Sequence, residues 1–304
     1  MSDKTTFDSD PEVLSRIASL NIRATNLVEG LLSGQHRSRH KGSSVEFAEY
    51  KDYTPGDEIK RIDWKVVGKT DKYHVKQFEQ STNLKATILL DASGSMGYES
   101  PDPRGMNKMD YARTLVAALS YLFLKQYDAV GLSLFNENIM NHIPPRSKPA
   151  HFQHILHGLA TLMPTGVTRL EDVIGNLVER LPSRGILILV SDFLTKETDV
   201  EQKLKLLVSR GLEVILFHIL DPDEVSFPFE GDIVFESLED DPPVGLDPED
   251  IRETYKREIQ SQIEYYRSRC AGLGVDYVFL ETSTPLEQGL SYYLLHRKSL
   301  GKHS

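Results

Sequence analysis

The chain is poor in cysteine and tryptophan, with one of each among 304 residues. A lone thiol, Cys270, excludes an internal disulfide framework and is expected to be a partly buried side chain on a helix. No apolar run approaches the roughly 20 residues that a membrane-spanning helix needs. The first ten residues are polar and acidic, unlike the basic and apolar opening of a secretory signal peptide. These features predict a cytoplasmic protein with no transmembrane segment.

Basic side chains are also scarce, with 35 Lys and Arg against 45 Asp and Glu and a formal net charge of −10. This sign disfavours nonspecific nucleic-acid binding, so no nucleic-acid partner is expected. The excess of acidic side chains is local, because residues 221–253 hold thirteen acidic side chains and one basic side chain, Arg252. Such a block is typical of solvated loops, and the alternative is a docking surface for a basic partner.

The region from residue 85 to 304 alternates between apolar runs and helical patterns. Strands are predicted at 86–90, 129–135, 138–143, 185–190, 213–220 and 275–280, the third of them a weaker edge strand. Apolar stripes predict helices near 112–123, 152–159, 170–181, 200–210, 248–273 and 285–298. This alternation predicts an α/β fold with a doubly wound, mostly parallel sheet flanked by helices.

Residues 1–84 are predicted to form an N-terminal extension of a helix and short irregular strands. The helix is expected from Pro11 to Leu32, and the polar stretch after it contains the turn signal Pro55-Gly56. Trp64 is expected to anchor this extension against the sheet. The basic cluster at 36–41 is either a solvated loop or a site for phosphate or an acidic partner.

A polar motif, D-A-S-G-S at residues 91–95, follows the first predicted strand of the sheet. In open α/β sheets, ligands bind beyond the carboxyl ends of the strands, where the strand order reverses. If the strands at 86–90 and 185–190 are neighbours there, oxygen-bearing side chains from separate segments meet in one crevice. Hard oxygen ligands of this kind suit Mg²⁺, with Mn²⁺ or Ca²⁺ as alternatives. The candidate metal-binding residues are Asp91, Ser93, Ser95, Thr168 and Asp192.

Other interpretations of these residues are open. Asp and Ser in loops often accept backbone N–H groups without any metal, and Thr168 could simply cap a helix. An enzyme is the second alternative, a magnesium-dependent phosphohydrolase with Asp91 as the nucleophile. Such enzymes place a second acid two residues later, where this chain has Ser93, so the expected general acid is missing and no catalysis is expected.

Three histidines at 151, 154 and 157 raise the question of zinc. Helical zinc sites more typically pair histidines at i and i+4 with a nearby carboxylate. The spacing of three places these imidazoles beside the apolar stripe of a helix, so a zinc site is not expected.

The motifs taken together resemble two known groups of proteins. D-A-S-G-S with the later G-V-T at 166–168 and S-D at 191–192 resembles the metal-ion-dependent adhesion site of von Willebrand factor A domains. Y-T-P-G-D at 53–57 and R-I-D-W-K at 61–65, followed by this site, resemble the bacterial DUF58 family. The resemblance covers roughly residues 30–298 and implies a von Willebrand factor A-like domain.

The resemblance also implies a role for each residue of the site. Ser93, Ser95 and Thr168 would bind Mg²⁺ directly, while Asp91 and Asp192 would act largely through water or hydrogen bonds. An acidic side chain of a protein partner would complete the coordination shell. Because DUF58 proteins are often encoded beside MoxR-type AAA+ ATPases, the resemblance implies a noncatalytic adaptor or chaperone-like partner of such an ATPase.

Overall fold

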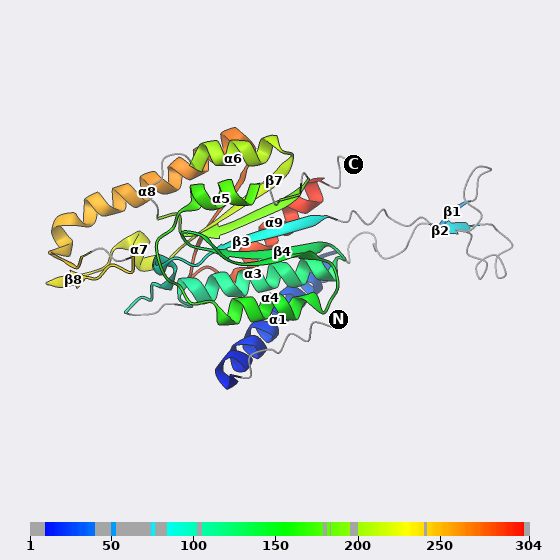
Figure 1. The fold of residues 1–304 in the computed structure, drawn as a ribbon, viewed down its shortest axis with the longest axis horizontal. Coiled ribbons are helices and arrows are strands. Elements are labelled where there is room, and N and C mark those ends of the chain that lie inside the picture. The colour runs from blue at the N-terminus through cyan, green and yellow to red at the C-terminus, as the bar shows by residue number, and fades with distance from the viewer. Residues whose placement is uncertain are drawn as a thin grey trace. The chain divides into compact units, whose positions relative to one another are not determined.

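The structure, a computed structural model of the chain, describes residues 10–39, 50–52, 74–76, 84–101, 105–178, 181–182, 184–194, 200–239 and 242–300 (Figure 1). The chain divides into two compact units, residues 1–29 with 84–304, and residues 30–83. The described residues 10–29 therefore group with the α/β unit.

The larger unit is built on one six-stranded sheet, and its central strands are buried along almost their whole length because helices cover both faces. In spatial order the strands are β10 (Asp276–Glu281), β7 (Leu212–Leu220), β6 (Gly185–Ser191), β3 (Lys85–Asp91), β4 (Ala129–Phe135) and β5 (Ile139–Arg146). The strands run parallel except β5, which pairs antiparallel with β4 at the edge. The chain order reverses beside β3, where β4 lies on one side and β6 on the other. The predicted α/β fold is confirmed.

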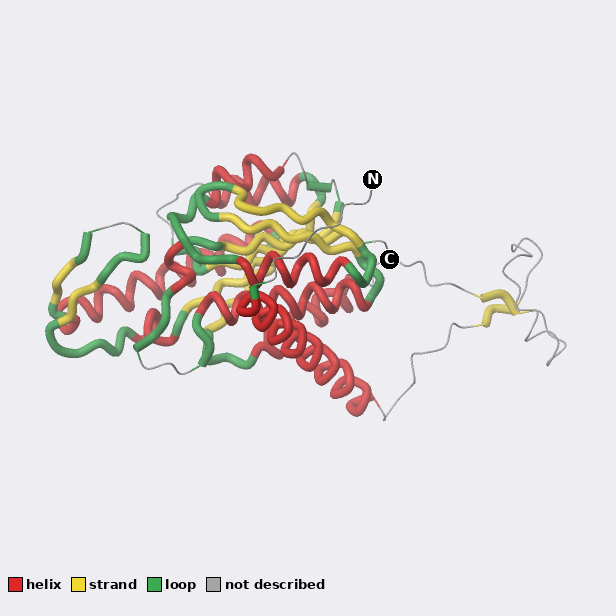
Figure 2. The backbone as a smooth tube through the Cα atoms, turned by 60° about the horizontal axis from the view of Figure 1, so that its bottom comes forward, coloured by secondary structure: helices red, strands yellow, loops and turns green. Residues whose placement is uncertain are grey.

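Helices lie on both faces of this sheet (Figures 1 and 2). One face carries α3 (Lys108–Lys125), α4 (His151–Thr161) and α9 (Leu286–Leu300), and the other carries α5 (Leu170–Val178), α6 (Val200–Ser209) and α8 (Pro248–Leu273). On the second face, Ile174 of α5 and Leu204 of α6 belong to one buried cluster with Leu187 of β6. This packing follows from the helical spacing of the apolar residues.

The N-terminal helix, α1 (Pro11–Arg39), is longer than predicted. It buries Leu20, Ala24 and Val28, which recur every four residues and so share one face of the helix. Farther along, Glu29 accepts a hydrogen bond of 3.0 Å from the hydroxyl of Tyr121 on α3. Residues 11–29 of α1 are thereby attached to the α/β unit.

In the smaller unit, the described strands are β1 (Tyr50–Asp52) and β2 (His74–Lys76), which pair antiparallel. Pro55-Gly56 and Trp64 lie outside the described residues, as do the side chains of the basic cluster at 36–41. Among the helices that the structure describes, none is both long enough and apolar enough to cross a bilayer.

Short elements at the ends of the strands were not predicted. They are the 3-10 helix η2 (Gly94–Gly97), helix α7 (Pro222–Ser226), and the paired strands β8 (Ile233–Phe235) and β9 (Val244–Leu246). Helix α7 begins with a capping box between Asp221 and Glu224. Asp221, Asp223 and Glu224 are buried, so the expectation of a solvated loop is wrong for this part of the acidic block.

Candidate metal centre

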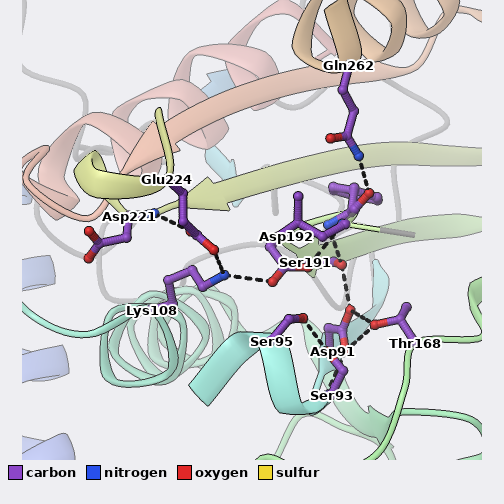
Figure 3. Close-up of polar contacts among 12 residues, drawn as sticks. Asp91, Ser93, Ser95, Lys108, Thr168, Ser191, Asp192, Asp221, Glu224 and Gln262 are labelled. Carbon is purple, nitrogen blue, oxygen red and sulfur yellow. Dashed lines mark hydrogen bonds and ion pairs between the residues drawn. The ribbon is translucent and has the colours of Figure 1, made fainter. Parts of the chain in front are cut away.

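The two acids of the candidate site lie at the same edge of the sheet. Asp91 is the last residue of β3, and Asp192 directly follows β6. These strands are parallel neighbours, with Leu90 opposite Val190, so both carboxylates emerge together (Figure 3). Both side chains are fully buried. The prediction that these two strands are neighbours in the sheet is confirmed.

Asp91 is the centre of a compact hydrogen-bond network. Its Oδ1 accepts the backbone N–H of Ser93 at 2.9 Å, and its Oδ2 accepts the hydroxyl of Ser191 at 2.6 Å. The hydroxyl of Thr168 lies 3.2 Å from Oδ2 and 3.4 Å from Oδ1. Thr168 therefore faces the carboxylate from a segment remote in the sequence, rather than serving only as a helix cap (Figure 3).

Backbone hydrogen bonds hold the loop of Thr168 against the D-A-S-G-S loop. Thr165 N–H donates to the carbonyl of Ala92, and Gly94 N–H donates to the carbonyl of Gly166, both at 2.8 Å. Gly166 has a φ of +74°, a conformation that favours glycine. These contacts explain how residues so far apart in the sequence reach one site.

Ser93 and Ser95 supply the other two hydroxyl groups. Their Oγ atoms lie 3.1 Å apart. The Ser95 side chain also interacts electrostatically with the carboxylates of Asp192 and Glu239. A hydroxyl carries one proton, so Ser95 can donate a hydrogen bond to only one acceptor at a time. A cation among these oxygens would satisfy the acceptors that the proton cannot reach. The donor set therefore fits a hard cation.

A buried lysine neutralises one of the two acids. Lys108, the first residue of α3, is fully buried, and its Nζ lies 2.8 Å from Asp192 Oδ2 and 2.6 Å from Glu224 Oε1 (Figure 3). Glu224 in turn accepts the backbone N–H of Asp221 at 2.8 Å through its second oxygen. When ionised, Asp91, Asp192 and Glu224 together with Lys108 leave a net charge of −2, which one divalent cation would balance.

The two acids differ in their electrostatic environment. Burial raises the pKa of Asp91 to about 7, and repulsion from Asp192 adds to this, against the hydrogen bonds from Ser191 and Ser93. Burial acts in the same direction on Asp192, but the Lys108 ammonium, together with Ser95 and the backbone N–H of Leu194, outweighs it and holds the pKa of Asp192 below its ordinary value. Within the described part of the chain, no basic side chain pairs with Asp91. Cationic charge is therefore lacking on the Asp91 side of the site.

A family model described as "Protein of unknown function DUF58" matches residues 49–265. The chain belongs to the DUF58 family. It is 28% identical over 233 residues to the uncharacterized protein Rv1480 of Mycobacterium tuberculosis. The matched residues make up 76% of this chain and 72% of that protein. It is 26% identical over 121 residues to the uncharacterized protein YeaD of Bacillus subtilis, covering 40% of this chain and 27% of that protein. The predicted family membership is confirmed.

Solved structures with a related fold include BatB from Bacteroides thetaiotaomicron and the VWA domain of SpRpn10. BatB has 18% sequence identity and a TM-score of 0.48, covering 71% of this chain and 99% of that chain. The SpRpn10 domain has 12% sequence identity and a TM-score of 0.41, and the match covers 68% of this chain and 93% of that domain. The strand order of the sheet and the helices on both of its faces make the fold of this DUF58 protein von Willebrand factor A-like.

The three histidines of this DUF58 protein do not gather around a common point. His151 is buried, and its Nε2 lies 2.9 Å from the carbonyl oxygen of Val130, while the rings of His151 and His154 are stacked with centroids 6.0 Å apart. In the described part of the chain, no three His, Cys, Asp or Glu side chains are grouped so as to hold a metal ion. His151 is instead bonded to the sheet backbone.

Sequence reasoning missed Lys108, Ser191, Glu224 and Glu239. Lys108 precedes Ala112 by four residues and so continues the apolar stripe of α3, a position from which a lysine points inward. Ser191 stood within the S-D motif but was not assigned a role. Glu224 and Glu239 carry no comparable signal, because both belong to an acidic block whose charges are mostly exposed.

Proposed function

We propose that this DUF58 protein is a noncatalytic binding module that uses a divalent cation to bind an acidic side chain of a protein partner. The observation that carries the proposal is the meeting of Asp91 and Asp192 with three hydroxyl groups at one edge of the sheet. Mg²⁺ fits such a set of few, hard oxygen ligands, and Mn²⁺ or Ca²⁺ are alternatives.

In this proposal the hydroxyls of Ser93, Ser95 and Thr168 hold the cation. Asp91 and Asp192 act through water or through the hydrogen bonds that orient these hydroxyls. When bound, the cation supplies positive charge that attracts a carboxylate from outside. Lys108 keeps Asp192 ionised and fixed in position, because its ammonium donates directly to Oδ2 of that acid.

The environment of Asp91 supports a binding role over catalysis. A phosphoryl-accepting carboxylate needs an oxygen that is free to attack, whereas both oxygens of Asp91 accept hydrogen bonds, the shortest from Ser191 at 2.6 Å. Position 93 offers a hydroxyl in place of the general acid. A phosphohydrolase would instead turn over p-nitrophenyl phosphate with Mg²⁺ and lose that activity in Asp91→Asn.

Titration calorimetry with Mg²⁺ tests the cation site. Asp91→Asn preserves the size of the side chain and removes its charge, and Asp250→Asn makes the same change at an exposed position on α8. We expect wild type and Asp250→Asn to bind one Mg²⁺, and Asp91→Asn to bind at least about tenfold more weakly. Equal affinity of all three proteins, with unchanged circular dichroism spectra, would refute the assignment.

A MoxR-type AAA+ ATPase is the partner we propose, with this chain as its adaptor in the cytoplasm. The support is the DUF58 membership, together with a site that needs an external acid. Because the ATPase itself requires Mg²⁺, the test compares protein variants rather than chelator. The purified ATPase from the same organism should be retained by immobilised wild type and by Asp250→Asn but not by Asp91→Asn, and equal retention would contradict the proposal.

A further inference from the structure

The acidic block at 221–253 reaches the candidate metal centre. A cavity of about 230 Å³ opens beside Ser95 and is lined on its other sides by Tyr98, Leu194, Glu224 and residues 236–239. Residues 236–239 directly follow β8, and the backbone carbonyl of Leu238 lies against Gly94 of the D-A-S-G-S loop. An acidic segment therefore lies where an external acid would have to approach.

Within this segment, Glu239 lines the same cavity as the proposed ligand Ser95. Burial raises the pKa of the Glu239 carboxyl, and repulsion from Asp192 adds to this, whereas attraction to Ser95 opposes it. Oxygen Oε1 of Glu239 is buried without a hydrogen-bond partner in the part of the chain that the structure describes. Buried polar atoms are nearly always paired, and each exception needs an explanation. A cation held beside Ser95 would supply such a partner.

The backbone next to Glu239 is pressed against the metal loop. A Cβ atom added to Gly94 would lie 1.9 Å from the carbonyl oxygen of Leu238. Only glycine at position 94 allows this approach. Gly94, the fourth residue of the D-A-S-G-S motif, thus leaves space for the backbone of Leu238, the residue before Glu239.

We propose that Glu239 is a built-in acidic ligand of this centre, which a partner's carboxylate must displace. This inference rests on the proposed function, because it needs a cation in the same site. A tethered carboxylate competes at an effective concentration in the millimolar range, so it lowers the apparent affinity for any external acid. Residues 236–238 are exposed, so they can leave the centre without opening the hydrophobic core.

Binding of Mn²⁺ measured by water-proton relaxation tests the inference, because relaxivity reports how many exchangeable waters the ion carries. We expect Glu239→Gln to bind Mn²⁺ at least about tenfold more weakly and to show the relaxivity of one additional water. Glu236→Gln is the matched control, since it removes one charge from the same cavity at a side chain that is exposed, whereas Glu239 is partly buried. It should match wild type in both measurements.

The outcomes separate this inference from the proposed function. If wild type binds Mn²⁺ but Glu239→Gln has the same affinity and relaxivity, the inference is overturned and the centre stands. If both glutamate variants weaken binding equally and leave relaxivity unchanged, general charge explains the effect and Glu239 is not a ligand. If wild type binds no Mn²⁺, the centre and the inference fall together.

Discussion

Replacing Lys108 by methionine removes the one ammonium that the structure places between Asp192 and Glu224. Its Nζ lies 2.8 Å and 2.6 Å from their oxygens, and the Lys108 side chain is fully buried. Methionine retains much of the apolar stem, so the change is chiefly a loss of charge and hydrogen bonds. The two carboxylates then face each other without a counter-ion in a site that water hardly reaches.

Removing one partner of a buried ion pair typically destabilises a protein by about 3–5 kcal/mol. For a domain of 150–250 residues, each kcal/mol lowers the melting temperature by roughly 2–4 °C, so the expected drop is roughly 6–20 °C. Protonation of Asp192 and Glu224 relieves the repulsion in the variant. The deficit should therefore shrink as the pH is lowered, because the variant raises the folded-state pKa values of both acids.

Thermal unfolding followed by circular dichroism measures this loss. Lys125→Met is the matched control, since Lys125 ends the same helix and pairs with Glu29 while both side chains remain 38% and 45% exposed. Such an exposed pair contributes about 0–1 kcal/mol, so the control should melt within a few degrees of wild type. If Lys108→Met melts at the same temperature as Lys125→Met, the ion pairs of Lys108 with Asp192 and Glu224 do not stabilise the fold as predicted.

Three further predictions concern other parts of the molecule. Gly94→Ala should push Leu238 away and weaken Mn²⁺ binding, because the added Cβ would lie 1.9 Å from the Leu238 carbonyl oxygen, whereas Gly272→Ala, in open space, should leave binding unchanged. Burial lowers the pKa of His218 to about 4. An unfolded histidine has a pKa of about 6.5, so between pH 6.5 and pH 4 the unfolded state binds more protons than the folded state. In this range His218 should lower the free energy of unfolding by up to about 1.4 kcal/mol for each pH unit that the pH falls. His218→Phe should flatten the pH dependence of urea unfolding by that amount, and an unchanged slope would contradict the account. Burial raises the pKa of Cys270 to about 12, so Ellman's reagent at pH 8 should label the urea-unfolded protein and spare the native one; rapid native labelling would show that the thiol is accessible.

The parts of the fold that follow from local pattern could be predicted from the sequence. The strand at 129–135 and the helix at 248–273 have the predicted bounds, because a continuous apolar run and a helical stripe with clear ends specify them. The approach of Asp91 to Asp192 also followed from the sequence, since acids after two buried parallel strands emerge at one edge when those strands pair.

Other features depend on tertiary contacts that no local pattern encodes. Glu224 and Glu239 look like ordinary members of an acidic block, yet Glu224 pairs with a buried lysine and Glu239 lines the same cavity as Ser95. Helix α7 has only five residues, too few for a periodic signal. Burial of an acid beside a lysine from another helix is a property of the folded chain alone.

A crystal structure of the protein grown with Mn²⁺, with anomalous diffraction recorded at the manganese edge, tests the central claim most directly. The account predicts one strong peak among the hydroxyl oxygens of Ser93, Ser95 and Thr168, with a carboxylate oxygen of Glu239 beside it. A map with no peak there, or with Mn²⁺ bound only at other acidic side chains, would contradict it.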